Sequence, residues 1–482
     1  MMYAFRGLGL AASLVLISSL TVVPQARAQS TAAYVYIQIQ GPAGAVYGYS
    51  ASSSGQLTAI SGSPFKPGTQ IIGSNKAQFF TLGHTLLHSF AVGSNGAIQS
   101  QLSQIAFMNY SGGTCDGTLA GDAGAVLDHT GKYVYVVLQS AGGPCAAYQS
   151  YIVNKDGSFS FDGDTELNWN GNGSGAGLPS ILGNETFAYS SYDYLDSGPV
   201  LTGFQRESSG TLQLMQFQEN YPSLNGDYYV TGRPDASPAG NYLVVQLAPE
   251  GGGGSTQLGS YTVDSQGNIS TTNTSSNMPA TSFINLYTSF SPSGNLLAAY
   301  ADGAETNGQS GIEIYNFNGA APLTLYKTLL TGTPIDQVAW DSSNHLYAIS
   351  TAQNKLYVFT VTATSVIQDS SISIGSPFSM VVVSQTATTG ACPAPSSDGV
   401  NVCSPAEGAT VTSPVLMDAA ATVSGGVYRF ELWSGSTKLL SVDNSGIMDQ
   451  SVSLAAGSYK LTFVARNSSG THEYAYRDIT VE

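Results

Sequence analysis

The side chains best suited to acid–base or metal chemistry are few and widely separated in the sequence. The chain has five histidines in 482 residues. His84 and His88 flank the apolar, strand-like segment Thr85-Leu-Leu, and no pair of acids lies nearby, so this spacing does not indicate a metal site. His129 and His345 lie in or beside polar turns, where we expect surface roles, and His472 stands alone. No GxSxG, HExxH or phosphate-loop pattern occurs, so no standard hydrolase or nucleotide-binding motif is indicated.

Two further segments contain groups that could bind a ligand. Asp162, Asp164 and Glu166 alternate as in the first half of a calcium loop, but Leu167 and Gly173 occupy the sixth and twelfth positions, where such a loop needs Gly and Glu. The pattern favours a solvated turn and leaves these three carboxylates as a metal candidate by spacing alone. The tyrosine-rich segments 189–194 and 221–229 could offer rings to a sugar or peptide, or could pack at strand edges.

The four cysteines predict two disulfides, because their number is even and the chain carries an export signal, described below. Nearest-neighbour pairing joins Cys115 to Cys145 and Cys392 to Cys403. A metal site is disfavoured because no CxxC occurs and no histidine lies close to a cysteine in sequence.

The N-terminus has the features of a secretory signal. Arg6 precedes the apolar run 8–23, and Ala26-Arg27-Ala28 provides the small residues that a cleavage site requires. We therefore expect residues 1–28 to be removed and the protein to be secreted, periplasmic or at the cell surface. No later segment could span a bilayer as a helix. The net charge of −16 makes nucleic acid and anionic lipid poor partners, and we expect no cofactor.

The middle of the chain repeats one pattern of turns and strands. Polar turns recur about every 50 to 55 residues, and each is followed by an apolar strand and then by further strands. This repeat length and strand pattern are typical of a four-stranded propeller blade. One unit is split, since residues 34–39 and 45–50 lack an inner strand that residues 376–384 could supply. We therefore predict an all-β, seven-bladed β-propeller over residues 30–384, closed by pairing residues 379–384 with residues 34–39.

The composition changes after the last repeat. Residues 385–399 form a linker rich in Pro, Ser and Thr, and residues 400–482 contain short alternating strands between Gly, Ser and Asn turns. A segment of this size and pattern predicts an Ig-like β-sandwich without the Cys-Trp-Cys core of antibody domains.

Two resemblances follow from these motifs. The Tyr-Val-Tyr-Val strands after Ser-Pro-x-Gly turns, and the segment Leu57-Thr-Ala-Ile-Ser-Gly-Ser-Pro-Phe65, resemble the lactonase-like seven-bladed propellers, the family of 6-phosphogluconolactonase and the YVTN-repeat surface proteins. The tail from Gly399 onward resembles the Ig-like modules of exported bacterial proteins. Both resemblances imply a fold more than an activity.

The family resemblance points to one candidate active site. Lactonase members carry Gly-Pro-Arg-His at the start of a blade and Asn-Glu-Leu after the next strand, whereas this chain has Gly232-Arg233-Pro234-Asp235 and Val245-Gln246-Leu247. Because the histidine and the glutamate are missing, we expect an exported, non-catalytic binding or scaffold protein of the cell envelope or exterior, with a carbohydrate or protein ligand. A purely structural envelope protein is a further class. The enzymatic alternative is a lactonase-like hydrolase that uses Arg233 and Asp235.

Overall fold

The structure is a computed structural model, and its elements are all β-strands in the part of the chain that it describes. That part is residues 31–482 except 42–43, 109–118, 141–145, 168–172, 195–197, 219–227, 231–232, 239–240, 250–255, 284–285, 304–308, 363–364, 386–391, 393, 412, 414, 444 and 453. Within it, no helix has the length and apolar character needed to cross a membrane. The proposed signal, residues 1–28, lies outside the described residues.

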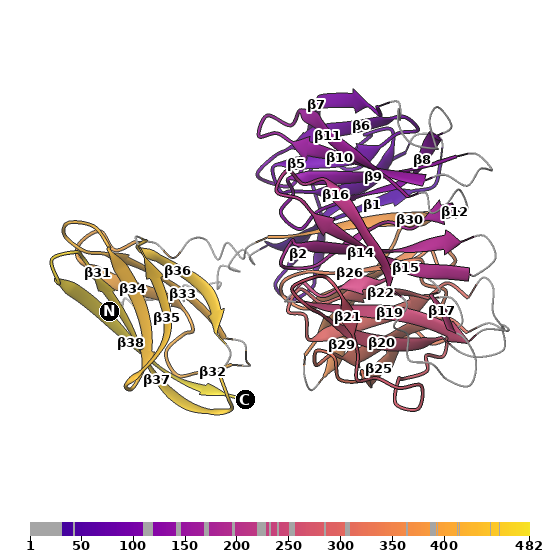
Figure 1. Cartoon of the computed structure of the whole chain (residues 1–482). Helices are drawn as coiled ribbons and strands as arrows, with labels where there is room; N and C mark the ends of the chain where they lie inside the picture. Colours follow the sequence, from indigo (N-terminus) through magenta and orange to yellow (C-terminus); the bar gives the residue numbers. More distant parts are fainter. Residues whose placement is uncertain are drawn as a thin grey trace, which may run out of the picture.

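Seven antiparallel sheets form the larger of two bodies, and each contains four or five strands (Figure 1). From the inner to the outer strand, the first blade contains β30 (Pro377–Ser384), β1 (Thr31–Ile39), β2 (Val46–Ser52) and β3 (Leu57–Ala59); the second contains β4 (Gln70–Ser74), β5 (Gln78–Leu82), β6 (Leu86–Val92) and β7 (Ile98–Ala106); and the third contains β8 (Leu119–Leu127), β9 (Tyr133–Ser140), β10 (Ala146–Val153) and β11 (Phe159–Glu166). The fourth blade contains β12 (Gly173–Ala176) with β13 (Ser180–Ile181), then β14 (Phe187–Tyr194), β15 (Gly198–Arg206) and β16 (Leu212–Gln218); the fifth contains β17 (Tyr228–Val230) with β18 (Asp235–Ala236), then β19 (Tyr242–Pro249), β20 (Gln257–Val263) and β21 (Ile269–Ser270). The sixth blade contains β22 (Tyr287–Phe290), β23 (Leu296–Ala301), β24 (Gly311–Asn316) and β25 (Thr324–Leu329), and the seventh contains β26 (Gln337–Trp340), β27 (His345–Ser350), β28 (Lys355–Val361) and β29 (Val366–Ser373).

The second strands of the sheets, such as β9, β19, β23 and β27, are mostly apolar because neighbouring sheets cover both of their faces. Every residue of β5 and of β27 is buried. Between the second and third sheets, Phe80 and Leu82 of β5 pack with Val134 and Val136 of β9. The core is thus a series of layers between blades.

The inner strands contact one another in a ring. Contacts join β30 to β4, β4 to β8, β13 to β18, β18 to β22, β22 to β26 and β26 to β30, while β9 contacts β12. This arrangement is that of a seven-bladed propeller, in which the inner strands surround a central channel.

The ring is closed by strands from its two ends, as predicted. β30 pairs antiparallel with β1, so that Val383 lies opposite Tyr34 and Ser379 opposite Gln38. Figure 1 shows the orange β30 beside the indigo β1. Without β30, β1 would present an open edge of unpaired backbone groups.

Tyrosine hydroxyls link successive blades at three equivalent places. Tyr36, Tyr135 and Tyr189 each lie on the second strand of a blade, and each donates a hydrogen bond to a glycine carbonyl in the outer hairpin of the next blade, at 2.6, 2.8 and 2.7 Å. One of these acceptors, Gly210, has a φ of +109°, and a Cβ there would lie 2.0 Å from the ring of Tyr133. A glycine is therefore required at this turn for both backbone and packing reasons.

The substitution Tyr189→Phe should lower the free energy of unfolding by about 1–3 kcal/mol, because the carbonyl of Gly267 would lose its buried donor. Chemical denaturation checks this. Tyr428→Phe is the matched control, since Tyr428 is 48% exposed and its hydroxyl is not needed to satisfy a buried carbonyl. Equal stability of the two variants would contradict a stabilising role for these inter-blade hydrogen bonds.

The smaller body is a two-sheet sandwich. One sheet contains β31 (Gly399–Ser404), β33 (Val415–Thr422) and β36 (Ile447–Val452); the other contains β32 (Ala409–Val411), β38 (His472–Val481), β37 (Gly457–Arg466), β34 (Arg429–Ser434) and β35 (Thr437–Asp443). Side chains of both sheets, such as Met417 and Phe463, share one core. The Ig-like assignment of this sandwich stays a prediction.

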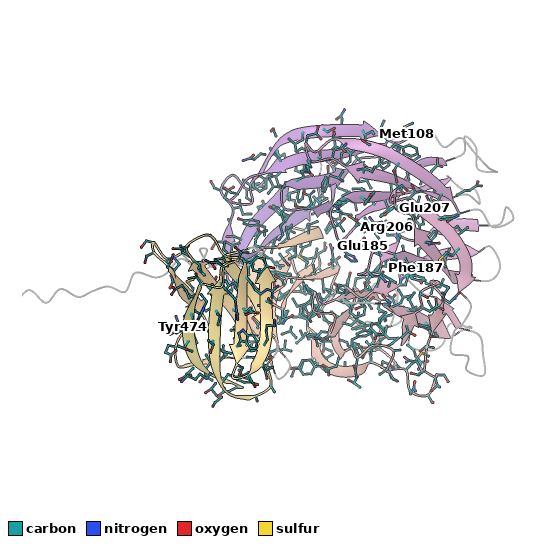
Figure 2. The ribbon with its side chains drawn as sticks, turned by 60° about the vertical axis from the view of Figure 1, so that its left-hand side comes forward. Met108, Glu185, Phe187, Arg206, Glu207 and Tyr474 are labelled. Carbon is teal, nitrogen blue, oxygen red and sulfur yellow. A yellow bond between two sulfur atoms is a disulfide. The ribbon has the colours of Figure 1, made fainter. Side chains whose placement is uncertain are left out.

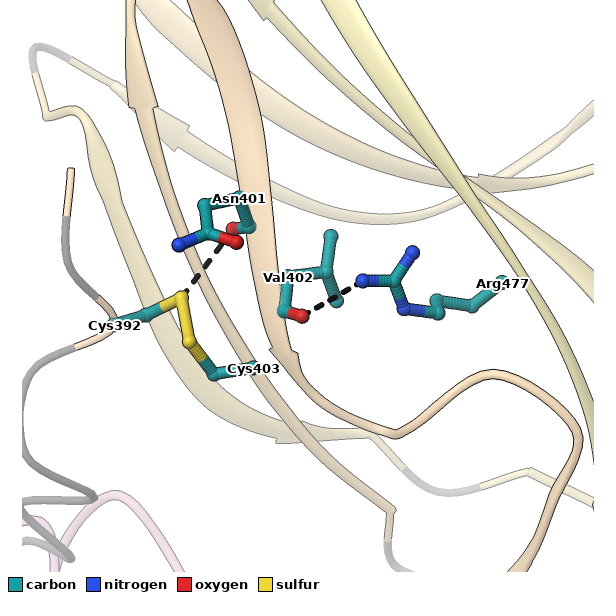
Figure 3. The surroundings of a disulfide bond; sticks show 5 residues. All are labelled: Cys392, Asn401, Val402, Cys403 and Arg477. Atoms are coloured by element: carbon teal, nitrogen blue, oxygen red, sulfur yellow. Dashed lines mark hydrogen bonds between the residues drawn. A yellow bond between two sulfur atoms is a disulfide. The ribbon is translucent and has the colours of Figure 1, made fainter. Parts of the chain in front are cut away.

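A disulfide joins Cys392, which precedes the sandwich, to Cys403 in β31 (Figure 3). The nearest-neighbour pairing predicts this bond. Close by, Arg477 donates a 2.8 Å hydrogen bond to the carbonyl of Val402 in the same strand. The second predicted pair, Cys115 with Cys145, lies outside the described residues and stays a prediction.

Candidate active site

Arg233 and Asp235 lie at the inner strand of the fifth blade. Asp235 begins β18 and pairs with Val244 of β19, and Arg233 comes two residues earlier. Because the inner strands surround the channel, these two side chains lie where the blades converge. We use the name channel site for Arg233, Asp235, Gln246, Thr288, Tyr287 and Tyr300.

The guanidinium of Arg233 is held in one place by its neighbour in the fourth blade. Its Nε donates to Ser180 Oγ at 3.0 Å, and its Nη2 donates to the carbonyl of Pro179 at 2.9 Å. Solvent reaches the side chain of Arg233, yet many protein atoms lie around its guanidinium. Both are expected of a group that lines a channel. Desolvation lowers the pKa of Arg233, and the charge of Asp235 opposes this effect. The guanidinium stays positively charged at neutral pH.

Asp235 has the properties of an acid–base group. Burial raises its pKa to about 6, although the Arg233 charge and hydrogen bonds from Phe290 and Thr288 act in the opposite direction. Its Oδ2 atom is buried and has no hydrogen-bond partner. A carboxyl group that titrates near neutrality and has an unused oxygen can accept a proton from a bound molecule.

Gln246 connects the fifth blade to the sixth. Its Nε2 donates to the carbonyl of Arg233 and to Thr288 Oγ1, both at 3.1 Å. Its Oε1 is buried and has no partner. The side chain therefore fixes the backbone of Arg233 and leaves a second buried oxygen at the channel site. Gln246 precedes Leu247 as the glutamate does in the family's Asn-Glu-Leu element.

Two tyrosines of the sixth blade complete the channel site. The rings of Tyr287 and Tyr300 stack with centroids 5.6 Å apart and an interplanar angle of 29°. Tyr287 is 56% exposed, whereas Tyr300 is buried. Burial raises the pKa of Tyr300, and the charge of Asp235 adds to this effect, which places the two side chains in one electrostatic environment. The exposed ring of Tyr287 offers an apolar surface beside the acid–base group.

The carboxylates proposed as a metal candidate do not form a loop. Asp162, Asp164 and Glu166 lie on β11, so the expectation of a solvated turn is wrong, because residues 159–166 pair with β10 around a bulge. Asp162 accepts a 2.8 Å hydrogen bond from Thr211, and burial raises the pKa of Asp164. The only group of three potential ligands that converges in the described part of the chain is Cys392, Cys403 and Asp418, whose cysteines form the disulfide.

None of the histidines is among the residues named as the channel site, but the charge of His129, in the turn between β8 and β9, lowers the pKa of Asp235 and therefore acts on that site. His129 is exposed, as expected. The expected surface role of His345 is wrong, since only 1% of its side chain is exposed and its Nδ1 lies 2.7 Å from Asp341 Oδ2. Burial lowers the pKa of His345, but the hydrogen bond and charge of Asp341 outweigh this and raise it. His84 is exposed, and burial lowers the pKa of the half-buried His88.

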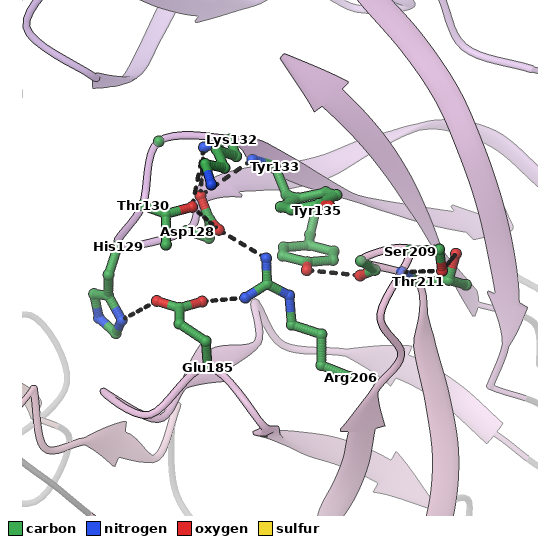
Figure 4. Close-up of polar contacts among 12 residues, drawn as sticks. Asp128, His129, Thr130, Lys132, Tyr133, Tyr135, Glu185, Arg206, Ser209 and Thr211 are labelled. Atoms are coloured by element: carbon green, nitrogen blue, oxygen red, sulfur yellow. Dashed lines mark hydrogen bonds and ion pairs between the residues drawn. The ribbon is translucent and has the colours of Figure 1, made fainter. Parts of the chain in front are cut away.

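A second charged cluster links the third and fourth blades (Figure 4). Arg206, 7% exposed, lies 2.8 Å from Asp128 and also pairs with Glu185, which in turn contacts His129 at 3.2 Å. The guanidinium also lies over the ring of Tyr133, 4.5 Å from its centroid. Figure 2 shows Glu185 and Arg206 side by side. Because the one guanidinium pairs with carboxylates from both blades, this cluster is a structural link between them. Sequence spacing gave no sign of it.

Of the tyrosines in segments 189–194 and 221–229, only the side chain of Tyr189 lies in the described part of the structure. Tyr189 is buried and donates to Gly267, which supports the packing interpretation for that residue. The side chains of residues 192–194 and 221–229 lie outside the described part, so a ligand-binding role for these tyrosines stays a prediction.

Several solved structures share the fold of the propeller. They include the "putative 6-phosphogluconolactonase" of Bacteroides fragilis (TM-score 0.52, 13% identity, 75% of this chain and 99% of that chain) and the periplasmic gluconolactonase of Pseudomonas aeruginosa (TM-score 0.51, 14% identity, 73% and 99%). A functionally unknown protein from Desulfotomaculum acetoxidans is similar to the same degree (TM-score 0.50, 14% identity, 73% and 99%). No family model and no curated protein matches the sequence. The chain therefore has the fold of the 6-phosphogluconolactonase-like β-propellers.

Proposed function

We propose that the propeller is a hydrolase of uncharged sugar lactones that acts at the channel site. The observation that carries the proposal is Asp235, whose carboxyl has a pKa of about 6 and whose buried Oδ2 has no partner. An unpaired carboxylate oxygen is costly to bury, and such groups cluster at active sites. The fold shared with a periplasmic gluconolactonase supports the same reaction class.

The proposed step is hydrolysis of a cyclic ester. Asp235, as the carboxylate, removes a proton from a water molecule while the water oxygen attacks the lactone carbonyl carbon. The carbonyl oxygen gains negative charge, which the guanidinium of Arg233 stabilises from its fixed position. The ring C–O bond then breaks, the proton passes from Asp235 to the leaving alkoxide, and the open-chain aldonic acid is released.

The charges around the channel favour an uncharged substrate. The inner strands, as the structure bounds them, contain no Lys or Arg, and Arg233 stands just before one of them. A phosphorylated lactone would need several cations or backbone donors for its phosphate. Arg233 donates to Pro179 and Ser180 through two of its five N–H groups, so the remaining donors can serve one oxyanion but not a phosphate group as well. The exposed ring of Tyr287 provides a surface for an uncharged sugar ring instead.

A second candidate function is an exported, non-catalytic binding propeller of the envelope or exterior. The observation that favours it is Gln246, which cannot titrate, in the position of the family's glutamate. Export itself is part of both proposals. It is supported by the predicted signal and by the disulfide, because disulfides persist in the periplasm and outside the cell.

We expect purified protein to hydrolyse glucono-δ-lactone above the spontaneous rate and to act poorly on its 6-phosphorylated form. Arg233→Ala should lower kcat/KM by about 100-fold, since it removes the group that stabilises the oxyanion. Proton release in weakly buffered solution at pH 7 measures the hydrolysis of each lactone by the wild-type protein and by the variant.

Lys327→Ala is the matched control for loss of a cation, because Lys327 lies on the outer strand of its blade. Absence of turnover by the wild-type protein would favour the binding protein instead. Faster hydrolysis of the phosphorylated lactone would contradict only the assignment of an uncharged substrate.

A further inference from the structure

The outer face of the five-stranded sheet of the sandwich carries a row of aromatic side chains. Tyr474 and Tyr476 lie two residues apart on β38 and are 56% and 50% exposed. The ladder places Thr462 of β37 opposite Tyr476, and Trp433 of β34 opposite Thr462. We call Tyr474, Tyr476, Thr462 and Trp433 the aromatic face. Figure 2 shows Tyr474 at the outer surface of the sandwich.

The aromatic rings form a twisted surface. The centroids of Tyr474 and Tyr476 are 5.4 Å apart with an interplanar angle of 59°. The ring centroid of His472, at the end of the row, lies 6.4 Å from that of Tyr474. Lys438 Nζ lies 5.5 Å from the centroid of the Trp433 ring. Two large exposed aromatic residues side by side lose apolar contact with water only when a partner covers them. The tilt between the rings suits a single twisted chain better than a flat crystalline surface.

The acidic side chains named on this face each have a basic neighbour. Glu431 is buried between Lys438 and Arg466, at 3.2 and 2.6 Å. Lys460 of β37 lies opposite Asp478 of β38 in the ladder. The face thus combines amphipathic rings with five charged side chains whose net charge is +1, while the whole chain has a net charge of −16 and repels polyanions. Charge complementarity therefore disfavours an anionic polymer and fits an uncharged, hydroxyl-rich one.

We propose that the aromatic face is a binding site for a single chain of an uncharged polysaccharide. The sugar rings pack on Tyr474 and Tyr476, and the hydroxyls exchange hydrogen bonds with the polar side chains beside them. The site is separate from the channel site and does not depend on lactone hydrolysis. It would hold the propeller on a glycan surface.

The test is affinity electrophoresis of the full chain in native gels that contain one soluble polysaccharide each. The uncharged probes are mixed-linkage β-glucan, xyloglucan, galactomannan and dextran, and the anionic probe is polygalacturonate. We expect retardation by at least one uncharged probe. The double variant Tyr474→Ala with Tyr476→Ala should weaken it by about 30-fold, which corresponds to about 1 kcal/mol for each ring.

Tyr428→Ala is the matched control, because Tyr428 is also an exposed tyrosine of this sheet but precedes β34, away from the row. It should keep the wild-type retardation, and both variants should keep the wild-type melting temperature, since the replaced rings are exposed. Retardation by polygalacturonate alone, by none of the probes, or equally in the double variant would overturn the proposal.

Discussion

Deleting residues 376–384 should lower the melting temperature of the propeller by about 10 °C or more. The deletion removes β30, including the buried Met380 and Val383, which contribute about 1.5–3 kcal/mol each by burial. It also leaves β1 as an open edge and removes the hydrogen bonds of Gln337 to Met380, at 2.7 and 2.9 Å. Because the ring is closed only through this strand, the loss extends to both neighbouring blades.

Scanning calorimetry of the full-length variant measures this effect, and the transition of the sandwich serves as an internal reference. The matched control removes residues 386–391, which lie after the last residue of β30, and should leave the propeller transition unchanged. A melting temperature equal to that of wild type after removal of β30 would refute closure of the ring by this strand.

The propeller could be predicted from the sequence because its signals are local and repeated. Each blade contributes an apolar strand such as β9 next to a polar turn, and hydrophobic pattern and turn residues are readable without tertiary information. Closure could also be predicted, because an incomplete first unit and a surplus last strand complement each other. The register between β1 and β30 could not be predicted from alternation, because β1 is buried on both faces.

Environments that depend on distant residues could not be predicted in this way. His345 follows a turn, which suggested exposure, yet it is buried against Asp341 and has a hydrogen bond with the backbone of Ser53 in the first blade. Asp162, Asp164 and Glu166 have the spacing of a loop, but pairing with β10 made this segment a strand. Tertiary context overrides such short local patterns.

At the candidate site, too, some features could be predicted from the sequence and others required the structure. The position of Arg233 and Asp235 at an inner strand could be predicted from the repeat. The raised pKa of Asp235 could not, because it arises from burial by surrounding blades and is tempered by residues such as Thr288, more than fifty positions away in sequence. The role of Gln246 in fixing the Arg233 carbonyl likewise required the structure.

Asp235→Asn should lower kcat/KM for glucono-δ-lactone by about 100- to 1000-fold, because the amide cannot remove a proton from water. In the wild-type protein, kcat/KM should rise with pH through about 6 and level off above it, since only the carboxylate acts as a base. The residual kcat/KM of the variant should not show this rise with pH. Initial rates from pH 4.5 to 7.5, corrected for spontaneous hydrolysis, measure both.

The same variant has a second readout that does not depend on activity. The pKa of Asp235 in the folded state, about 6, lies above the ordinary value of 3.8, so the folded state binds the proton more tightly than the unfolded state. Ionisation therefore costs stability progressively as pH rises from about 4 to 6, and the full cost remains at pH 8. Asp235→Asn should raise the melting temperature at pH 8 and change it little at pH 4.

Asp164→Asn is the matched control for both measurements, because Asp164 lies on the outer strand β11, away from the channel. It should retain the wild-type turnover and the wild-type rise of kcat/KM with pH near 6. If Asp235→Asn stabilises the fold at pH 8 but turnover is absent from wild type, the buried carboxylate serves binding. If the variant retains the acid limb, another group is the base and the assignment of Asp235 fails.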